Sequence, residues 1–230
     1  MKIISNEKLI KRNGIISQVT SLSSLLILGS GMYISFSKPD YFTLSVAALL
    51  AGFILSQVGI SLGNRFGRSP RPDELLDAGL KGLKNTYTIY HYSTPAQNLL
   101  VGPAGIWLLL PFHQHGDISY DGKKWKLKGG GFAQSYMRIF GQGNISRPDL
   151  DAGVQKDKLI KALKKTMAEE EIPNINAAII FTSNSANVLA ENAPIPTMHI
   201  KQLKSFIRKE VKNTQITKAE INAVNEALRA

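Results

Sequence analysis

Two histidines, His113 and His115, have the spacing of a pair of metal ligands. Alternate side chains of an extended chain point to the same side, so both imidazoles would lie on one face. Imidazole nitrogens are common ligands of Zn²⁺, which takes about four ligands in structural sites. Asp117 is the nearest further candidate. Because this set is too small, we favour a surface loop over a metal site and expect no cofactor.

A run of lysines around one tryptophan has the composition of a nucleic-acid contact. Lysine side chains pair with phosphates, and tryptophan rings stack on bases. The run consists of Lys123, Lys124, Trp125, Lys126 and Lys128. The same alternation of charged and apolar residues also protects an exposed edge strand from pairing with other chains. We favour this second explanation, so nucleic acid is not the favoured partner.

Two long charge-free runs lie near the N-terminus, at residues 14–36 and 41–63. At a rise of about 1.5 Å per residue, either run forms a helix long enough to cross a hydrocarbon core of about 30 Å. The short segment between them permits only a tight turn. We therefore predict a transmembrane hairpin, with a pair of buried core helices and a cleaved signal peptide as the alternatives.

Basic residues flank both ends of this predicted hairpin. Before the first run stand Lys2, Lys8, Lys11 and Arg12, and after the second stand Arg65, Arg68 and Arg71. The connecting turn offers only Lys38, which Asp40 offsets. Since cytoplasmic flanks are enriched in Lys and Arg, we predict a multi-pass protein of the cell membrane with both termini and the soluble domain in the cytoplasm.

The chain carries a net charge of +11, of which residues 1–72 contribute +6 from eight basic and two acidic residues. Positive charge beside the two apolar runs favours contact with anionic lipid headgroups. The absence of cysteine excludes disulfides, thiolate metal sites and cysteine nucleophiles. No ionisable residue lies within either run, so transport by this chain alone is not supported. The lipid bilayer is the expected partner of the first part of the chain.

Small residues recur along the second apolar run, at Ala48, Gly52 and Ser56. Spacing of four residues places them on one ridge, which lets another helix backbone approach closely. We favour the first helix of the hairpin as the packing partner. The alternatives are a second copy of the chain, which would make a homo-oligomer, or another membrane-protein subunit.

The rest of the chain has the pattern of one mixed α/β domain at 72–212, followed by a C-terminal helix within 213–230. Residues 1–13, before the first apolar run, are predicted to be a cytoplasmic N-terminus. A helix is expected after Pro72, where leucines recur at helical spacing. The continuous apolar strand 106–110 must be buried on both faces of a sheet. An Asp-Gly turn at Asp121 predicts a hairpin of two strands. The expected strands are 86–92, 97–101, 106–110, 118–120, 125–128, 177–181 and 195–199, and the later helices are 149–170, 201–211 and one from Thr217.

The order of these elements and the phrase at 98–110, with its Gly-Pro-Ala-Gly turn at 102–105, resemble the nuclease-related domain (NERD) family. The similarity covers roughly residues 73–210 and includes segments 180–184 and 200–204. This resemblance implies a restriction-endonuclease-like fold with a mixed central sheet. In a nuclease of that fold, an Asp near the start of the second strand and a Glu-x-Lys at the end of the third hold a divalent cation.

At the positions that match these ligands, the chain departs from the pattern. It has Gln97 or Asn98 in place of the Asp, and Leu110, Pro111 and Phe112 in place of the Glu-x-Lys. Leucine and phenylalanine cannot bind Mg²⁺, which prefers oxygen ligands. In the first helix, only Glu74 could match the acid of the family. The resemblance therefore predicts a degenerate form without the metal site.

From these observations we expect a noncatalytic membrane protein, in which a degenerate nuclease-like domain serves as an interaction or scaffold module. It would act as an accessory subunit of a membrane complex. One alternative is a membrane-tethered nuclease that uses Mg²⁺ or Mn²⁺ with relocated residues, and another is a nucleic-acid-binding module without chemistry. The relocated residues would be Glu74, Asp117, Asp121 and Lys126.

Overall fold

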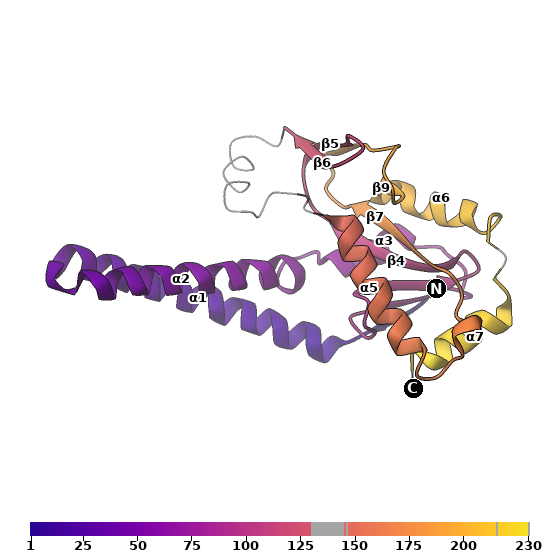
Figure 1. The fold of residues 1–230 in the computed structure, drawn as a ribbon, viewed down its shortest axis with the longest axis horizontal. Coiled ribbons are helices and arrows are strands. Elements are labelled where there is room, and N and C mark those ends of the chain that lie inside the picture. Colours follow the sequence, from indigo (N-terminus) through magenta and orange to yellow (C-terminus); the bar gives the residue numbers. More distant parts are fainter. Residues whose placement is uncertain (130–144, 146, 215, 230) are drawn as a thin grey trace. The chain divides into compact units, whose positions relative to one another are not determined.

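The computed structural model of the chain describes residues 1–129, 145, 147–214 and 216–229 (Figure 1). The chain divides into two compact units. One is Asn6–Arg71, and the other combines Met1–Ser5 with Pro72–Ala230. The first is a pair of helices, and the second is a mixed α/β domain.

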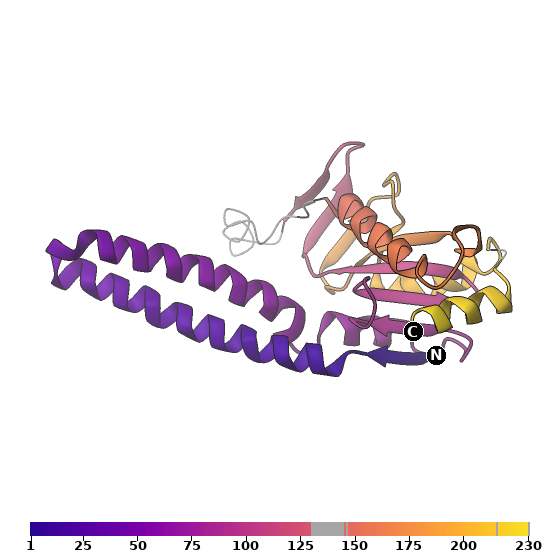
Figure 2. The same ribbon diagram turned by 60° about the horizontal axis from the view of Figure 1, so that its bottom comes forward.

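The helical unit consists of α1 (Glu7–Ser37) and α2 (Phe42–Leu62), which run antiparallel side by side (Figure 2). A short 3-10 turn, Pro39–Tyr41, joins them, and a π-helical turn, Gly63–Gly67, follows α2. Both helices are long and apolar enough to cross a membrane, as predicted. Large apolar side chains cover their outer surface and are exposed. This is the surface that a hydrocarbon environment would accept.

Small residues let the two helices approach closely, and they recur every seven positions. The buried residues of this kind are Ser17, Ser24 and Gly31 in α1 and Ser45, Gly52 and Gly59 in α2. A Cβ on Gly52 would lie 2.7 Å from Leu28 Cγ. Ser17 Oγ donates a hydrogen bond to the Gly59 carbonyl at 2.9 Å. Spacing of 3.5 residues per turn is typical of a left-handed helix pair.

The four-residue ridge expected on α2 contributes only part of this interface. Gly52 lies in it, and the Ala48 Cβ is 3.1 Å from the position that a Cβ on Gly31 would take. The Ser56 hydroxyl instead donates to the Phe53 carbonyl of its own helix at 2.7 Å. The packing repeat is therefore seven residues, which continues along the whole length of α2.

A six-stranded mixed sheet, in the order β1-β2-β3-β4-β7-β9, forms the centre of the α/β domain. Strands β2, β3 and β4 are antiparallel, β7 and β9 run parallel to β4, and β1 runs parallel to β2. The strands are β1 (Lys2–Ser5), β2 (Thr88–His91), β3 (Asn98–Gly102), β4 (Gly105–Phe112), β7 (Ile175–Phe181) and β9 (Thr197–His199). The predicted mixed sheet is confirmed.

Helices cover both faces of this sheet (Figure 1). Apolar residues of α3 (Pro72–Leu80) and α6 (Ile200–Glu210) pack with Trp107 and Leu109 on one face. Those of α5 (Pro148–Leu163) and α7 (Lys218–Ala227) belong to the cluster of Ile106, Leu108 and Leu110 on the other. The central strand β4 is thus buried on both faces, as its apolar sequence predicted.

The predicted hairpin belongs to a separate three-stranded sheet, ordered β6-β5-β8. Its strands are β5 (Gly116–Tyr120), β6 (Trp125–Lys128) and β8 (Ala186–Leu189). The sequence did not predict β8. The helix expected at 149–170 is shorter, because α5 ends at Leu163 and a 3-10 turn, Glu169–Glu171, precedes β7.

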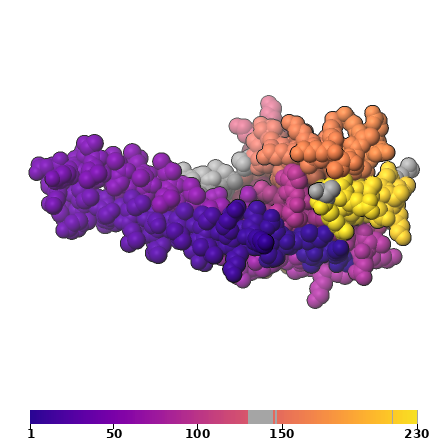
Figure 3. Space-filling model, turned by 90° about the horizontal axis from the view of Figure 1, so that it is seen from below, coloured from indigo at the N-terminus to yellow at the C-terminus, as the bar shows by residue number. Residues whose placement is uncertain are grey.

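The first residues of the chain form a strand of the domain, where the sequence predicted only a cytoplasmic segment. Strand β1 pairs in parallel with β2, from Lys2 opposite Thr88 to Ser5 opposite His91. In Figure 3 the start of the chain, in indigo, lies against segments from the middle of the sequence, in magenta. Segments before α1 and after α2 therefore belong to the same compact unit.

Candidate functional site

A buried polar cluster includes Asn98, one of the positions that the resemblance matches to the metal-binding Asp of a nuclease. His91 ends β2 and faces Asn98, the first residue of β3, across the antiparallel ladder. His91 Nδ1 is 2.8 Å from Asn98 Oδ1, and His91 Nε2 is 3.1 Å from Asp77 Oδ1 of α3. His91 is fully buried and Asn98 is 1% exposed. The three side chains thus form one hydrogen-bonded cluster, in which Asp77 is the partly exposed member.

The helix α3 brings its acids to this cluster through its helical repeat. Leu76 and Leu80 of α3 are buried against the sheet, and Asp73 and Asp77 are one turn apart on the helix. Asp73 is buried, whereas Glu74 is exposed. Asp77 contacts the sheet through His91, whereas the acid of this helix that the resemblance matches to the family is Glu74.

Electrostatics favour a charged imidazole in this cluster. Burial lowers the pKa of His91, but hydrogen bonds to Asp77 and Asn98 and the negative charges of Asp77 and Asp73 outweigh it, so the pKa is raised above its ordinary value. A carboxylate oxygen can only accept, so Nε2 carries a proton. The Asn98 amide oxygen accepts from Nδ1, which leaves Asn98 Nδ2 buried without a partner in the described part of the chain.

On this face of the sheet, the neighbouring strand offers only apolar side chains. The register pairs Leu99 with Leu108, so Asn98 lies beside Leu109. Leu109 is buried in the same apolar cluster as Leu76 and Leu80 of α3. Leu110, one of the positions matched to the family's Glu-x-Lys, belongs to the cluster on the opposite face. A hard cation would meet the acids of α3, Asp77 and Asp73, together with an imidazole whose pKa is raised, and it would find no side-chain oxygen ligand on β4.

Three residues of the relocated-nuclease alternative lie on the other sheet. Asp117 Oδ1 accepts from the Asn187 amide at 2.9 Å. Asp121 accepts the backbone N–H groups of Lys124 and Lys123 and lies 2.9 Å from Lys126 Nζ. These contacts lower the pKa of Asp121 far below its usual range. Asp121 and Lys126 are thus brought together in the hairpin turn, whereas Glu74 lies on a helix that packs on the six-stranded sheet.

Metal-ligating groups do not converge elsewhere in the part of the chain that the structure describes. No group of three or more His, Cys, Asp or Glu residues there has the arrangement of a metal site.

The lysines of the hairpin are exposed, but the tryptophan between them is not. Lys123, Lys124, Lys126 and Lys128 face solvent. Trp125 is 8% exposed, and its ring lies 5.2 Å from that of Tyr120. Stacking on a base requires an open ring face, which this packing does not leave. Strand β6 is at the edge of its sheet, where lysines discourage pairing with other chains.

His113 and His115 lie beyond the carboxyl end of β4. Their rings are 5.1 Å apart in an edge-to-face arrangement. Both contact the turn that follows the parallel strand β7, because parallel strands end at the same edge of a sheet. His113 Nδ1 is 3.1 Å from Thr182 Oγ1, and His115 Nδ1 is 2.5 Å from Ser183 Oγ. The two histidines therefore link the segment after β4 to the segment after β7 through hydrogen bonds with hydroxyl groups.

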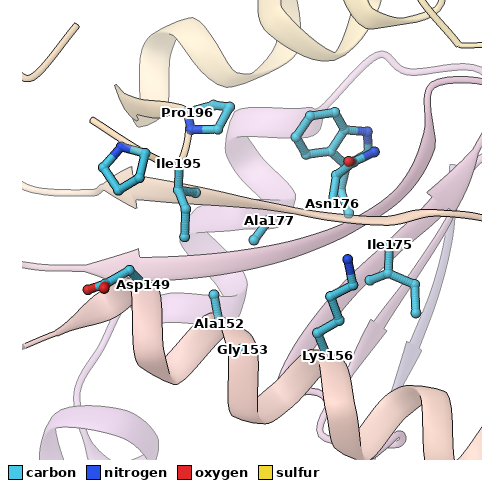
Figure 4. Close-up of a pocket in the computed structure, with 11 residues that line it drawn as sticks. Asp149, Ala152, Gly153, Lys156, Ile175, Asn176, Ala177, Ile195 and Pro196 are labelled. Atoms are coloured by element: carbon cyan, nitrogen blue, oxygen red, sulfur yellow. The ribbon is translucent and has the colours of Figure 1, made fainter. Parts of the chain in front are cut away.

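A pocket of about 290 Å³ opens between α5, β7 and the segment that leads into β9 (Figure 4). Its polar side chains are Asp149 and Lys156 of α5 and Asn176 of β7. Trp107, Ala152, Gly153, Ile175, Ala177, Pro194, Ile195 and Pro196 complete the lining. Sequence analysis missed this pocket, because its residues form no motif and come from four separate parts of the chain.

No protein-family model, no curated protein and no solved structure matches the chain.

Proposed function

We propose that the chain is a noncatalytic, membrane-tethered interaction module with a degenerate nuclease-like domain. One observation carries this proposal: Asn98, a position that the resemblance matches to the metal-binding Asp of a nuclease, is buried in a hydrogen-bonded cluster with His91 and Asp77. A metal-dependent nuclease needs carboxylates open to a cation, a water molecule and a phosphodiester. Here Asn98 is 1% exposed and lies against His91, which is itself fully buried.

The order of elements supports a restriction-endonuclease-like ancestry for the domain. A helix, three antiparallel strands, a second helix and a strand parallel to the third occur in this order as α3, β2, β3, β4, α5 and β7, with β5 and β6 inserted between β4 and α5. Helices lie on both sides of the resulting sheet. The same sequence of elements underlies the resemblance to the nuclease-related domain family.

The helical pair supports attachment to a membrane. Leu22, Leu25 and Leu26 of α1 are each more than 60% exposed, and α2 presents similar residues. Exposure of this much apolar surface is unfavourable in water, at about 25 cal/mol per Å². Basic residues on both flanks and their scarcity in the turn favour a hairpin with the domain at the cytoplasmic face of the cell membrane.

A nuclease assay on the full chain in lipid nanodiscs tests the absence of catalysis. Single- and double-stranded DNA and RNA are incubated with it in Mg²⁺ or Mn²⁺, with Glu74→Gln as the matched variant. We expect no cleavage by either protein. Cleavage that Glu74→Gln abolishes would contradict the proposal and support a nuclease with relocated ligands.

Binding measurements with the same nucleic acids separate the remaining alternative. Salt-sensitive binding that is lost on Lys123→Glu with Lys128→Glu would identify a nucleic-acid-binding module instead. For an interaction module, we expect a stoichiometric membrane protein to copurify with the full chain in mild detergent. Recovery of the chain alone from native membranes, after chemical cross-linking, would contradict that role.

A further inference from the structure

The outer edge of β7 is paired along only half of its length. Strand β9 pairs with Ile179, Ile180 and Phe181, and in the described residues no strand lies beside the first half, from Ile175 to Ala178. The Ile179 N–H donates to the Pro196 carbonyl at 2.9 Å, so the backbone groups of Ile179 point to this edge. Successive residues of a strand alternate, so those of Ala177 and Ile175 point the same way.

The segment before β9 cannot extend the ladder along this edge. Pro194 and Pro196 lack the backbone N–H that a pairing strand must supply. The chain instead passes over the edge and forms one wall of the pocket, to which Ile175 and Ala177 also contribute. The pocket therefore lies along the unpaired half of the β7 edge, where a further strand could pair. The segment with Pro194 and Pro196 bounds it on one side, and α5 bounds it on the other.

The charges around the pocket favour an anionic group. Asp149 is held by Arg147, whose Nη2 donates to Asp149 Oδ2 at 3.0 Å. Lys156 is half-buried, and no carboxylate in the described ranges lies within ion-pair distance of it. Figure 4 shows its side chain directed from α5 toward the strand that carries Ile175. Among the charged side chains of the pocket lining, Lys156 is thus the one without an opposite charge in the described residues. It lies beside the unpaired half of β7.

We propose that this pocket binds an extended acidic peptide segment of a partner protein, which adds a strand beside the first half of β7. Backbone groups of Ala177 pair with the peptide, Lys156 binds a carboxylate, and Ala152, Ile195 and Pro196 contact an apolar side chain. Addition of a strand to an open sheet edge gives affinity through the main chain and specificity through the pocket. This inference rests on the proposed role as an interaction module and names its partner class.

Peptide display on the full chain in lipid nanodiscs tests the assignment. A random peptide library is selected for binding to the unsubstituted protein. Peptides that also bind the Gly153→Leu variant are then removed. A Cβ on Gly153 would have no atom within 4 Å, so the backbone of α5 leaves space for a side chain to start at this position of the pocket lining. Leucine is also a better helix former than glycine. Asp157→Leu, at an exposed position of α5 outside the pocket, is the matched control.

We expect enriched peptides to carry an acidic residue at one fixed position, with β-branched residues on alternate positions. Gly153→Leu should abolish their binding, whereas Asp157→Leu should preserve it. Lys156→Glu should weaken binding by about tenfold, a change of about 1.4 kcal/mol, whereas Lys158→Glu on the exposed face should change it less than about twofold. Bound peptide should slow the hydrogen exchange of the Ala177 amide.

Several results would overturn the assignment. The pocket would be excluded as a peptide site if no peptides remain after those that bind Gly153→Leu are removed. It would also be excluded if the selected peptides bind the unsubstituted protein and Gly153→Leu equally. Displacement by inorganic phosphate that depends on Lys156 would identify a phosphate site instead. A partner that copurifies equally with the unsubstituted chain and with Gly153→Leu would leave the proposed function standing and refute only this inference.

Discussion

At the scale of single residues, the most informative position is His91, because it is fully buried and its pKa is nevertheless raised. Sequence analysis found no role for it, since a lone histidine in a predicted strand carries no spacing signal. Its contacts with Asp77 and Asn98 exist only because α3 packs on the sheet. The hydrogen-bonded cluster around His91 could therefore be recognised only in three dimensions.

The raised pKa of His91 predicts a stability that falls as pH rises. A histidine whose pKa is higher in the folded than in the unfolded protein contributes fully below its unfolded value, about 6.5, and loses this contribution as pH passes through the folded value. Both tryptophans, Trp107 and Trp125, lie in the domain, so their fluorescence in the full chain reports its unfolding. Unfolding midpoints across this pH range measure the effect.

The variant His91→Gln isolates this effect. It should lower the free energy of unfolding by about 2–3 kcal/mol at acidic pH, since it removes a hydrogen-bonded charge from a buried site, and it should flatten the pH dependence. Asp77→Asn should flatten it as well, because the partner that favours the proton is lost. An unchanged slope in His91→Gln would show that another group is responsible.

At the scale of elements, the helical pair is defined by close approach at small residues. Both the four-residue ridge expected from sequence and the observed seven-residue repeat pass through Gly52. Sequence alone could not choose between them, because α2 also offers other small residues at either spacing. The choice depends on which face meets α1, and the hydrogen bond from Ser17 to Gly59 lies on that face.

Substitution at Gly59 tests this interface against a matched position. A Cβ on Gly59 would lie 2.5 Å from Ser21 Oγ and 3.0 Å from the Ser21 backbone nitrogen, so Gly59→Ala must push the helices apart. Such overpacking costs about 1–3 kcal/mol. Gly29→Ala, with no atom within 4 Å of the added Cβ, should have no such cost.

Energy transfer between dyes on cysteines introduced at Lys8 and Arg65 would follow separation of the helices during titration with SDS. The natural chain has no cysteine, so labelling is specific. The midpoint should fall for Gly59→Ala and stay unchanged for Gly29→Ala. Equal midpoints for the two variants would refute the seven-residue interface.

At the scale of the whole molecule, local patterns predicted more than long-range pairing did. The apolar helices, the buried strand β4 and the Asp121 hairpin turn follow from periodicity and turn chemistry within short segments. Strand β1 was missed because its four residues pair with β2, far along the chain. The pocket was missed for a similar reason, since it exists where the pairing of β7 with β9 stops.

The pairing of β1 with β2 also constrains how the chain meets a membrane. Segments on both sides of the helical pair belong to one unit, so both must lie on the same face of any membrane that the helices cross. Because basic residues flank the helical pair, we expect the short turn at Lys38 outside the cell and the domain inside.

Single cysteines at Asn6, Lys38 and Lys123, placed in the cysteine-free chain, test this topology with a membrane-impermeant maleimide on intact cells. Only Lys38→Cys should react before permeabilisation, and reaction at just one of Asn6→Cys and Lys123→Cys would contradict the pairing of the N-terminal strand with the domain.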